Sequence, residues 1–153
     1  MIIAVSDTGP LIHLAEIDSF SLLRSIDELL IPETVRDELA TGGLPDGFGD
    51  LDVSVVPDID IDDVDLDPGE TAALGVARDR NAIFLTDDLD ARQAAKSRGV
   101  EVHGTVGLIA LAHSRGELSE EAATDRMRSL ASETSLFVTD AVIQRGIALL
   151  NQS

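Results

Sequence analysis

The sequence of 153 residues predicts one α/β domain built on a central parallel sheet. Short apolar runs at residues 2–5 and 82–86 are typical of strands buried on both faces. Stretches with helix start and stop signals lie between the expected strands, and this alternation favours parallel strands with right-handed crossovers. Only 3 % of the residues are aromatic, with no Trp or Tyr, so Leu, Ile, Val and Ala must build the core.

The first expected strand, residues 2–5, ends in the sequence Ser-Asp-Thr-Gly-Pro. This is turn and helix-start chemistry, and it predicts a helix capped by Thr8 with Pro10 in its first turn. Asp7 is therefore expected at the carboxyl end of a central strand. Open α/β sheets bind their ligands at that end of the strands.

The next elements follow the same alternation. We expect a short helix over residues 17–25, a strand over 28–31, and a helix that starts at Pro32 and stops at residues 41–43. Residues 42–67 form an acidic loop region with many Asp and no basic residue, in which residues 53–56 could form a strand. A calcium-binding loop is excluded there, because no register places Gly at loop position 6 and Glu at position 12.

The second half predicts further helices and strands. They are a helix over 67–80, a strand over 82–86, a helix through Ser97 closed by Gly99, a strand over 100–103, and helices over 105–113 and 119–130. Residues 137–140 lead into a last helix that ends near Leu150. We find no internal repeat and no linker, so residues 1–150 are expected to form one domain.

Composition excludes several kinds of protein. Without Cys there are no disulfides, no thiol catalysis and no cysteine-bound zinc. No apolar run approaches the ~20 residues of a membrane span. The first residues lack the basic segment of a signal peptide. We therefore expect a soluble, cytoplasmic protein with no membrane partner.

The net charge of −18 by itself argues against nucleic acid as a ligand, because phosphates are repelled by an anionic surface. Lys96 is the one lysine among eleven basic residues. Excess acid with scarce lysine is typical of a protein that works in concentrated salt. At ~1 M salt the Debye length is ~3 Å, so the net charge hardly repels a ligand at a distance. We interpret the composition as halophilic.

Carboxylates occur where a metal site could form. They are Asp7 after the first strand, Glu38 on the helix that starts at Pro32, Glu70 near a later helix start, and Asp87, Asp88 and Asp90 after the strand over 82–86. Each has a simpler interpretation as a cap or a solvated charge, and Glu70 stands at capping-box distance from Asp67. However, Glu70 also shares the core-facing stripe of its helix with Leu74.

The combination is more informative than any single carboxylate. Two acidic groups follow two buried strands, and they converge if those strands are neighbours. Adjacent carboxylates repel one another and raise one another's pKa unless a cation neutralises them. A hard, all-oxygen set without His suits Mg²⁺ or Mn²⁺.

Other motifs fit less well. The tripeptide at residues 7–9, Asp-Thr-Gly, is that of aspartic proteases, which need a second copy or a dimer and an all-β fold. A haloacid-dehalogenase-type phosphatase needs a second Asp at position 9, which is Gly. His13, His103 and His113 have no zinc or triad spacing and are interpreted as structural. No Gly-rich phosphate-binding loop is present.

Five ordered motifs carry a family resemblance. They are residues 6–11 (Ser-Asp-Thr-Gly-Pro-Leu), 31–39, 66–74 (Leu-Asp-Pro-Gly-Glu-Thr-Ala-Ala-Leu), 84–88 with Ala91-Arg92, and 104–108 (Gly-Thr-Val-Gly-Leu). Over nearly the whole chain this order resembles the PIN-domain nucleases, in particular a PIN-like branch of predicted nucleic-acid-binding proteins related to toxin-type ribonucleases; residues 137–140 resemble that branch's tail. The resemblance implies a three-layer α/β/α domain with a central parallel sheet.

The resemblance also implies roles for individual residues. The catalytic acids are Asp7, Glu38, Glu70 and Asp88, and the metal ligands add Asp87 and Asp90 to these four. Ser6, Thr8 and Thr86 would orient ligands or water. The family usually has Asp where this chain has Glu70. A Thr-x-Asp pattern favours Asp88 as the ligand, with Asp87 as the alternative.

The activity implied by the resemblance is an Mg²⁺- or Mn²⁺-dependent endoribonuclease that leaves a 5′-phosphate and a 3′-hydroxyl. Arg78, Arg92 and Lys96 are candidate RNA contacts, with solvated charges as the equal alternative. The family further implies a toxin silenced by a small antitoxin protein, and a homodimer. Two other functions stay open: a PIN-fold module that binds nucleic acid or protein without turnover, and a metal-dependent phosphatase of small esters.

Overall fold

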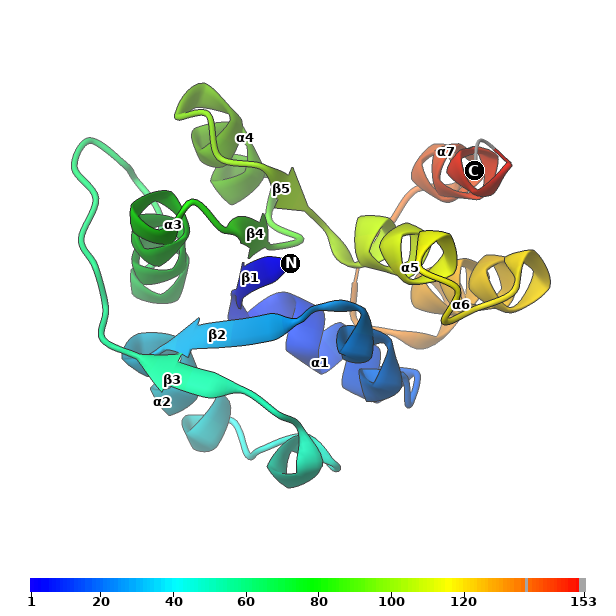
Figure 1. Cartoon of the computed structure of the whole chain (residues 1–153), viewed down its shortest axis with the longest axis horizontal. Coiled ribbons are helices and arrows are strands. Elements are labelled where there is room, and N and C mark those ends of the chain that lie inside the picture. Colours follow the sequence, from blue (N-terminus) through cyan, green and yellow to red (C-terminus); the bar gives the residue numbers. More distant parts are fainter. Residues whose placement is uncertain (137, 152–153) are drawn as a thin grey trace.

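The computed structural model describes residues 1–136 and 138–151, so Phe137 of the expected tail motif lies outside the described residues. Five parallel strands form one sheet in the order β3-β2-β1-β4-β5 (Figure 1). The strands are β1 (Ile3–Ser6), β2 (Glu28–Pro32), β3 (Ser54–Val56), β4 (Ile83–Leu85) and β5 (Val102–His103). The helices are α1 (Thr8–Glu16), η1 (Phe20–Ser25), α2 (Glu33–Thr41), η2 (Phe48–Asp50), α3 (Pro68–Arg80), α4 (Leu89–Ser97), α5 (Thr105–Ser114), α6 (Glu120–Glu133) and α7 (Asp140–Leu150).

Strand β1 is the centre of the sheet. Val5 is in register with Leu30 of β2 on one side and with Phe84 of β4 on the other. The two buried strands that the sequence predicts are therefore neighbours. Their carboxyl ends, and the acidic residues that follow them, meet at one edge of the sheet.

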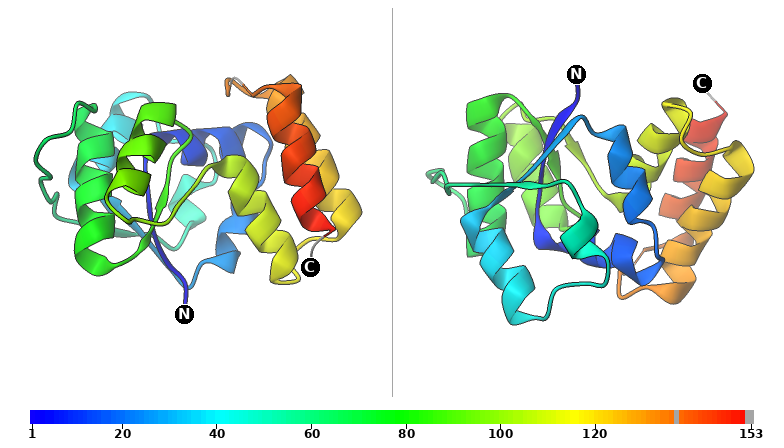
Figure 2. Two further views of the ribbon diagram at one scale, coloured as in Figure 1. Left: turned by 90° about the horizontal axis from the view of Figure 1, so that it is seen from above. Right: turned by 60° about the horizontal axis from the view of Figure 1, so that its bottom comes forward.

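Alternate residues of the strands enter two separate cores. Ala4, Leu29 and Ile31 pack with helices α1, α2, α5, α6 and α7 on one face. Val5, Leu30 and Phe84 pack with α3 and α4 on the other. Helices α5, α6 and α7 lie side by side at one end of the molecule (Figure 2). The expected α/β architecture with helices on both faces of a parallel sheet is confirmed.

Two strands are shorter than the sequence predicts, for the same physical reason. Ala82 donates its backbone N–H to Ala77 O, and Val100 donates to Ala95 O. The residue before each is in the left-handed region, with φ of 52° and 72°. These are helix C-cap motifs, which take up the first residue of each expected strand. Strand β4 therefore begins at Ile83 and β5 at Val102, although Glu101 O already accepts a hydrogen bond from Phe84 N–H of β4.

The short helix expected over residues 17–25 is a 3₁₀-helix, Phe20–Ser25. Asp18 has a φ of 50°, and Ser19 donates its backbone N–H to Leu14 O. This capping turn closes α1 and delays the next helix until Phe20. The acidic region at 42–67 contains the edge strand β3 and one 3₁₀ turn, Phe48–Asp50, that the sequence does not indicate.

Candidate functional site

Asp7 directly follows β1 and is almost buried, with 8 % of its surface exposed. It caps α1 itself: Thr8 N–H donates to Asp7 Oδ1 at 2.8 Å. The expected cap, Thr8, is instead the first residue of the helix, and its hydroxyl donates to Glu38 Oε2 at 2.7 Å. Thr86 Oγ1 donates to Asp7 Oδ2 at 3.1 Å. Two threonines thus hold two carboxylates at the carboxyl edge of the sheet.

Glu70 lies at the start of α3 and is also buried, with 7 % exposed. It forms a capping box with Asp67: Glu70 N–H donates to Asp67 Oδ1 at 2.8 Å, and Asp67 N–H donates to Glu70 Oε1 at 3.3 Å. Glu70 therefore takes part in the capping box of α3 and is also buried at the edge of the core. Both sequence interpretations of this residue, as a capping residue and as part of the core-facing stripe, agree with its position. One carboxylate oxygen of Glu70 makes no hydrogen bond to a described backbone group.

Gly69 allows a third acid, Glu38, to lie close to the start of α3. A Cβ on Gly69 would lie 2.6 Å from both Glu38 Oε1 and Glu38 Oε2. Only glycine therefore lets the α2 carboxylate approach the N-terminus of α3 so closely. In the sequence Asp-Pro-Gly-Glu at residues 67–70, the Asp caps α3 and the Pro is its first residue. The Gly allows the close approach of Glu38, and the Glu is the buried acid.

The electrostatics show that these acids act on one another. Burial, helped by the charges of Asp67 and Glu38, raises the pKa of Asp7 from 3.8 to about 6 against the lowering effect of the hydrogen bonds from Thr8 and Thr86. Burial raises the pKa of Glu70 from 4.5 to about 8, together with a hydrogen bond to Asp88 and the charges of Asp67 and Asp7. We call Asp7, Glu38, Asp67, Glu70 and Asp88 the carboxylate cluster.

Asp88 joins the cluster from the start of α4. Its Oδ2 accepts the N–H of Ala91 at 2.8 Å, which caps the helix, and its own N–H donates to Thr86 Oγ1 at 3.3 Å. The residue is exposed, unlike Asp7 and Glu70. The Thr86 hydroxyl therefore donates to the Asp7 carboxylate and accepts from the Asp88 backbone N–H. This one hydroxyl connects the residues that follow β1 and β4.

The other two expected ligands lie apart from the cluster. His13 Nδ1 donates to Asp87 Oδ2 at 2.7 Å, and Thr105 N–H donates to Asp87 Oδ1 at 2.6 Å. Burial raises the pKa of Asp87, but the hydrogen bonds from His13 and Thr105 outweigh it and the pKa is lowered. Asp90 is exposed on the first turn of α4 and has no hydrogen-bond partner among the described residues. Ser6 is buried and donates to the carbonyl of Asp7.

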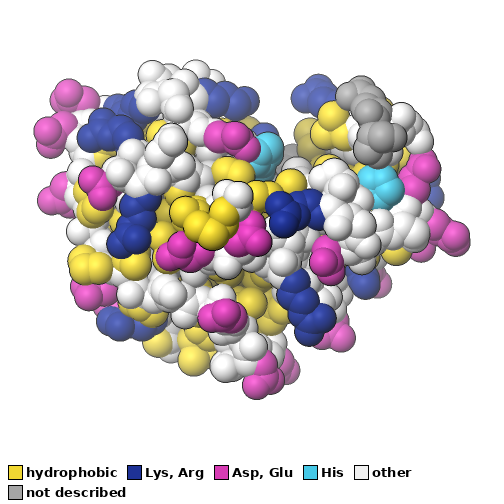
Figure 3. Space-filling view, in the orientation of Figure 1, with side chains coloured by type: hydrophobic (Ala, Val, Ile, Leu, Met, Phe, Trp, Pro, Cys, Tyr) yellow, Lys and Arg dark blue, Asp and Glu magenta, His cyan; other side chains and the backbone are white. Residues whose placement is uncertain are grey.

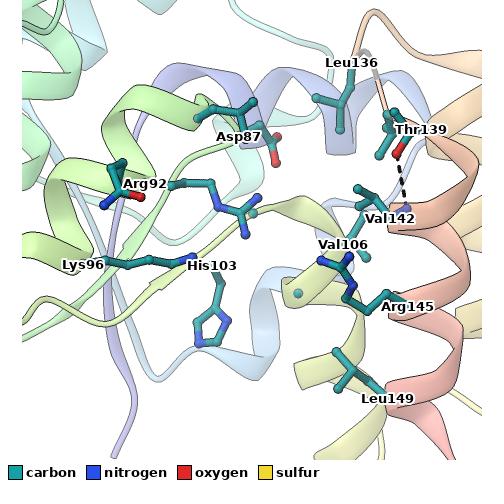
Figure 4. Close-up of a pocket in the computed structure, with 16 residues that line it drawn as sticks. Asp87, Arg92, Lys96, His103, Val106, Leu136, Thr139, Val142, Arg145 and Leu149 are labelled. Carbon is teal, nitrogen blue, oxygen red and sulfur yellow. Dashed lines mark hydrogen bonds between the residues drawn. The ribbon is translucent and has the colours of Figure 1, made fainter.

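The candidate RNA contacts are divided between two places. Arg92 and Lys96 point from α4 into a groove that α7 borders on the other side (Figure 4). Arg78 lies beside Met1 and Asn81, near the amino ends of the strands and away from the cluster. Arg145 of α7, which no sequence pattern singles out, lies across the groove from Arg92 (Figure 4).

The donor chemistry of the cluster fits a hard divalent cation, because every donor is a carboxylate oxygen. The charges that shift the pKa values of Asp7 and Glu70 are all negative, which a cation would relieve. The described residues do not contain three His, Asp or Glu side chains already gathered in a metal-binding geometry. A cation bound here would therefore require these side chains to change their rotamers.

Asp67 is the cluster member that sequence reasoning treated only as a cap. Its spacing to Glu70 was the available signal, because a capping box holds both carboxyl groups within hydrogen-bond distance of the same helix start. Pairing of β1 with β4 then places Asp7 beside them. The role of His13 as the partner of Asp87 has no local sequence signal, since 74 residues separate the two.

A five-stranded parallel sheet with a cluster of carboxylates at its carboxyl edge, two of them buried, defines a class of α/β protein with an acidic site. Comparison with protein-family models gives the family. A PIN-domain model, DUF3368, matches residues 3–152 of the chain. The protein belongs to the PIN-domain family, whose members are generally nucleases that bind nucleic acid and use divalent metal ions.

A solved structure has a similar fold. It is a PilT N-terminus domain protein, SSO1118, from the hyperthermophilic archaeon Sulfolobus solfataricus P2, with a TM-score of 0.57 and 21 % sequence identity. The alignment covers 72 % of this chain and 93 % of that one. No curated protein matches the sequence. Among the described residues, no helix is long and apolar enough to cross a membrane.

Proposed function

We propose that the protein is a divalent-metal-dependent endoribonuclease whose site is formed by Asp7, Glu38, Glu70 and Asp88. The observation that carries the proposal is that two buried acids, Asp7 and Glu70, lie within the influence of further carboxylates. Burial and neighbouring carboxylates raise the pKa values of Asp7 and Glu70 to about 6 and about 8. Asp7 and Glu70 also cap helices, but capping alone does not require carboxylates with raised pKa values to be placed beside one another, whereas a bound cation would relieve their repulsion.

The proposed division of labour follows from the contacts. Asp7, Glu38, Glu70 and Asp88 would hold Mg²⁺ or Mn²⁺ through oxygens that keep free lone pairs. Thr8 orients Glu38, and Thr86 orients Asp7. Asp67 keeps its cap on α3 and adds negative charge. When bound, the cation supplies a nucleophile at neutral pH and stabilises charge on the phosphate.

The reaction is hydrolysis of an RNA phosphodiester. The water oxygen bonds to phosphorus, the bond from phosphorus to the 3′-oxygen breaks, and the leaving oxygen takes up a proton. The products are a 5′-phosphate and a 3′-hydroxyl. The carboxylates would contribute by holding the cation beside the reacting phosphate, where its positive charge would stabilise the transition state.

The direct test is cleavage of a single-stranded oligoribonucleotide with and without Mn²⁺, for the wild type and for Asp7→Asn. We expect metal-dependent cleavage that falls by about 100-fold in the variant. Asp79→Asn, an exposed acid at the end of α3, is the matched control and should cleave normally. Equal cleavage by wild type and Asp7→Asn would contradict the proposal.

Two other outcomes would select the alternative functions. Release of phosphate from a small ester without RNA cleavage would indicate a metal-dependent phosphatase. Binding of RNA or protein with no turnover would indicate a binding module, which the net charge of −18 favours for a protein partner. We further propose, from the family resemblance, a homodimeric toxin with a small antitoxin, tested by growth arrest on expression and by its rescue.

A further inference from the structure

A second feature lies beside the carboxylate cluster, on the other side of the loop that carries Asp87. It is a groove of about 610 Å³ between α4 and α7, with the start of α5 as its floor. Figure 3 shows a hollow between these parts of the molecule, with Lys and Arg side chains on both flanks. We call it the α4–α7 groove.

The rims of the α4–α7 groove carry exposed aliphatic side chains. Leu89 at the start of α4 is 76 % exposed, and Leu149 near the end of α7 is 47 % exposed. Val106, Val142 and Leu136 continue the apolar lining between them (Figure 4). Large exposed aliphatic side chains that lie together along a groove are typical of a surface that binds a partner.

Three cations line the same groove: Arg92 and Lys96 from α4, and Arg145 from α7 (Figure 4). None of the three makes an ion pair or a side-chain hydrogen bond with the described residues. This is unexpected in a chain with 29 acidic and 11 basic residues. The one carboxylate among the described lining residues, Asp87, is already engaged by His13 and Thr105.

Two glycines at the start of α5, Gly104 and Gly107, leave room for side chains that line the groove. A Cβ on Gly104 would lie 3.3 Å from Arg92 Nη1 and 2.8 Å from Asp87 Oδ1. A Cβ on Gly107 would lie 3.2 Å from His103 Nδ1. The two glycines therefore let Arg92 and His103 lie against the start of α5, with their polar ends in the groove.

We propose that the α4–α7 groove docks an acidic amphipathic segment of a protein partner, with its apolar side chains against Leu89 and Leu149 and its carboxylates at Lys96 and Arg145. Charge complementarity selects this occupant: the groove is cationic on a molecule that is otherwise strongly anionic. The aliphatic rims favour protein over nucleic acid, because phosphates gain nothing from exposed leucine. An apolar helix face laid into a groove is a common mode of peptide recognition.

The proposal is independent of nuclease activity, and it is tested with the metal-free full chain in a chelator. The probe is a fluorescent peptide of about 15 residues, four helical turns, with Leu at i, i+3, i+4 and i+7 and Glu elsewhere. A second peptide keeps every Leu and replaces Glu by Lys. We expect fluorescence anisotropy to show that the acidic peptide binds the protein more tightly than the basic one.

This preference is diagnostic, because general attraction to a protein of charge −18 would favour the basic peptide. We expect the double variant Lys96→Gln/Arg145→Gln to bind the acidic peptide about tenfold more weakly, and Leu89→Ser/Leu149→Ser to weaken it as well. Arg80→Gln/Arg128→Gln removes the same charge from exposed positions outside the groove and should bind like the wild type. All these side chains are exposed, so melting temperatures should be unchanged.

Two results would overturn the proposal. One is a preference for the basic peptide, or acidic-peptide binding that the groove variants leave unchanged. The other is nucleic-acid occupancy: a single-stranded oligoribonucleotide that displaces the peptide and loses affinity in Lys96→Gln/Arg145→Gln but not in Leu89→Ser/Leu149→Ser. That pattern would assign the groove to the RNA strand instead.

Discussion

The neighbouring aspartates after β4 have opposite environments. The side chain of Asp87 is only 10 % exposed and accepts hydrogen bonds from His13 and Thr105. Asp88 is exposed, caps α4 and faces Glu70. The Thr-x-Asp resemblance favours Asp88 as the ligand, and the contacts support this choice over Asp87. The engagement of Asp87 by His13 of α1 and Thr105 of α5 depends on long-range packing, so the sequence could not predict it.

Exchanging either aspartate for asparagine should separate their roles. Asp88→Asn keeps a good helix cap, so we expect normal stability but loss of the Mn²⁺ stabilisation that the proposed site predicts for the wild type. Asp87→Asn leaves His13 and Thr105 without a charged acceptor, so the free energy of unfolding should fall by about 1–3 kcal/mol, with the Mn²⁺ response kept. Melting curves with and without Mn²⁺ measure both effects. The reverse pattern would make Asp87 the ligand.

The raised pKa values of Asp7 and Glu70 predict how stability depends on pH. Both acids bind protons more tightly in the folded state, so the metal-free protein should lose stability as pH rises. The loss begins near pH 4 and runs through the folded pKa values of about 6 and about 8. Glu70→Gln should remove the part of this slope between pH 6 and 8. Melting temperatures that rise between pH 6 and 8 in the wild type, but not in the variant, would refute this account.

At the scale of elements, the sequence predicts the order and type of the main helices and strands well. The apolar runs, caps and prolines are local signals, and they indicate β1, α2, α3, α5 and the start of α6 close to their observed bounds. Capping turns explain the shortened β4 and β5, because Ala82 and Val100 are apolar yet belong to the preceding helix ends. Apolar pattern alone cannot separate a strand residue from a capping residue.

The contact between α3 and the acidic loop region gives a test at the same scale. A Cβ on Gly75 would lie 1.9 Å from the carbonyl oxygen of Ile59, so alanine there must push the loop backbone away. We expect Gly75→Ala to lower the free energy of unfolding by about 1–3 kcal/mol, despite the better helix propensity of alanine. Chemical denaturation measures the change.

Gly49→Ala is the matched control, because a Cβ at Gly49 has nothing within 4 Å. Its effect should stay within about 0.5 kcal/mol. If Gly75→Ala is as stable as the wild type, residues 58–60 do not pack on α3 in solution as they do in the structure.

At the scale of the whole molecule, the 29 acidic and 11 basic residues predict self-repulsion that salt can screen. The described residues contain few ion pairs that could offset it, since most acids lie on the surface without a cation. The halophilic interpretation therefore stays a prediction about behaviour in solution.

Raising KCl from about 0.1 M to about 2 M should increase the melting temperature, because the Debye length falls from ~10 Å to below ~3 Å. Differential scanning calorimetry at constant pH in chelator measures the effect. Potassium chloride is chosen because neither ion strongly changes apolar burial, unlike sulfate. A melting temperature that is flat or falls with KCl would contradict the halophilic interpretation.

The strand order has a consequence for the newly made chain. Strand β1 is synthesised first, yet its partner β4 follows much later: Ala4 pairs with Ile83, 79 residues along the chain (83 − 4). Such distant pairing raises the contact order, which slows folding. On the ribosome, the nascent chain can join β1 to β2 early, but Asp7 meets Thr86 and Asp88 only after residue 88 has left the exit tunnel. The acidic site is thus absent from every shorter nascent chain.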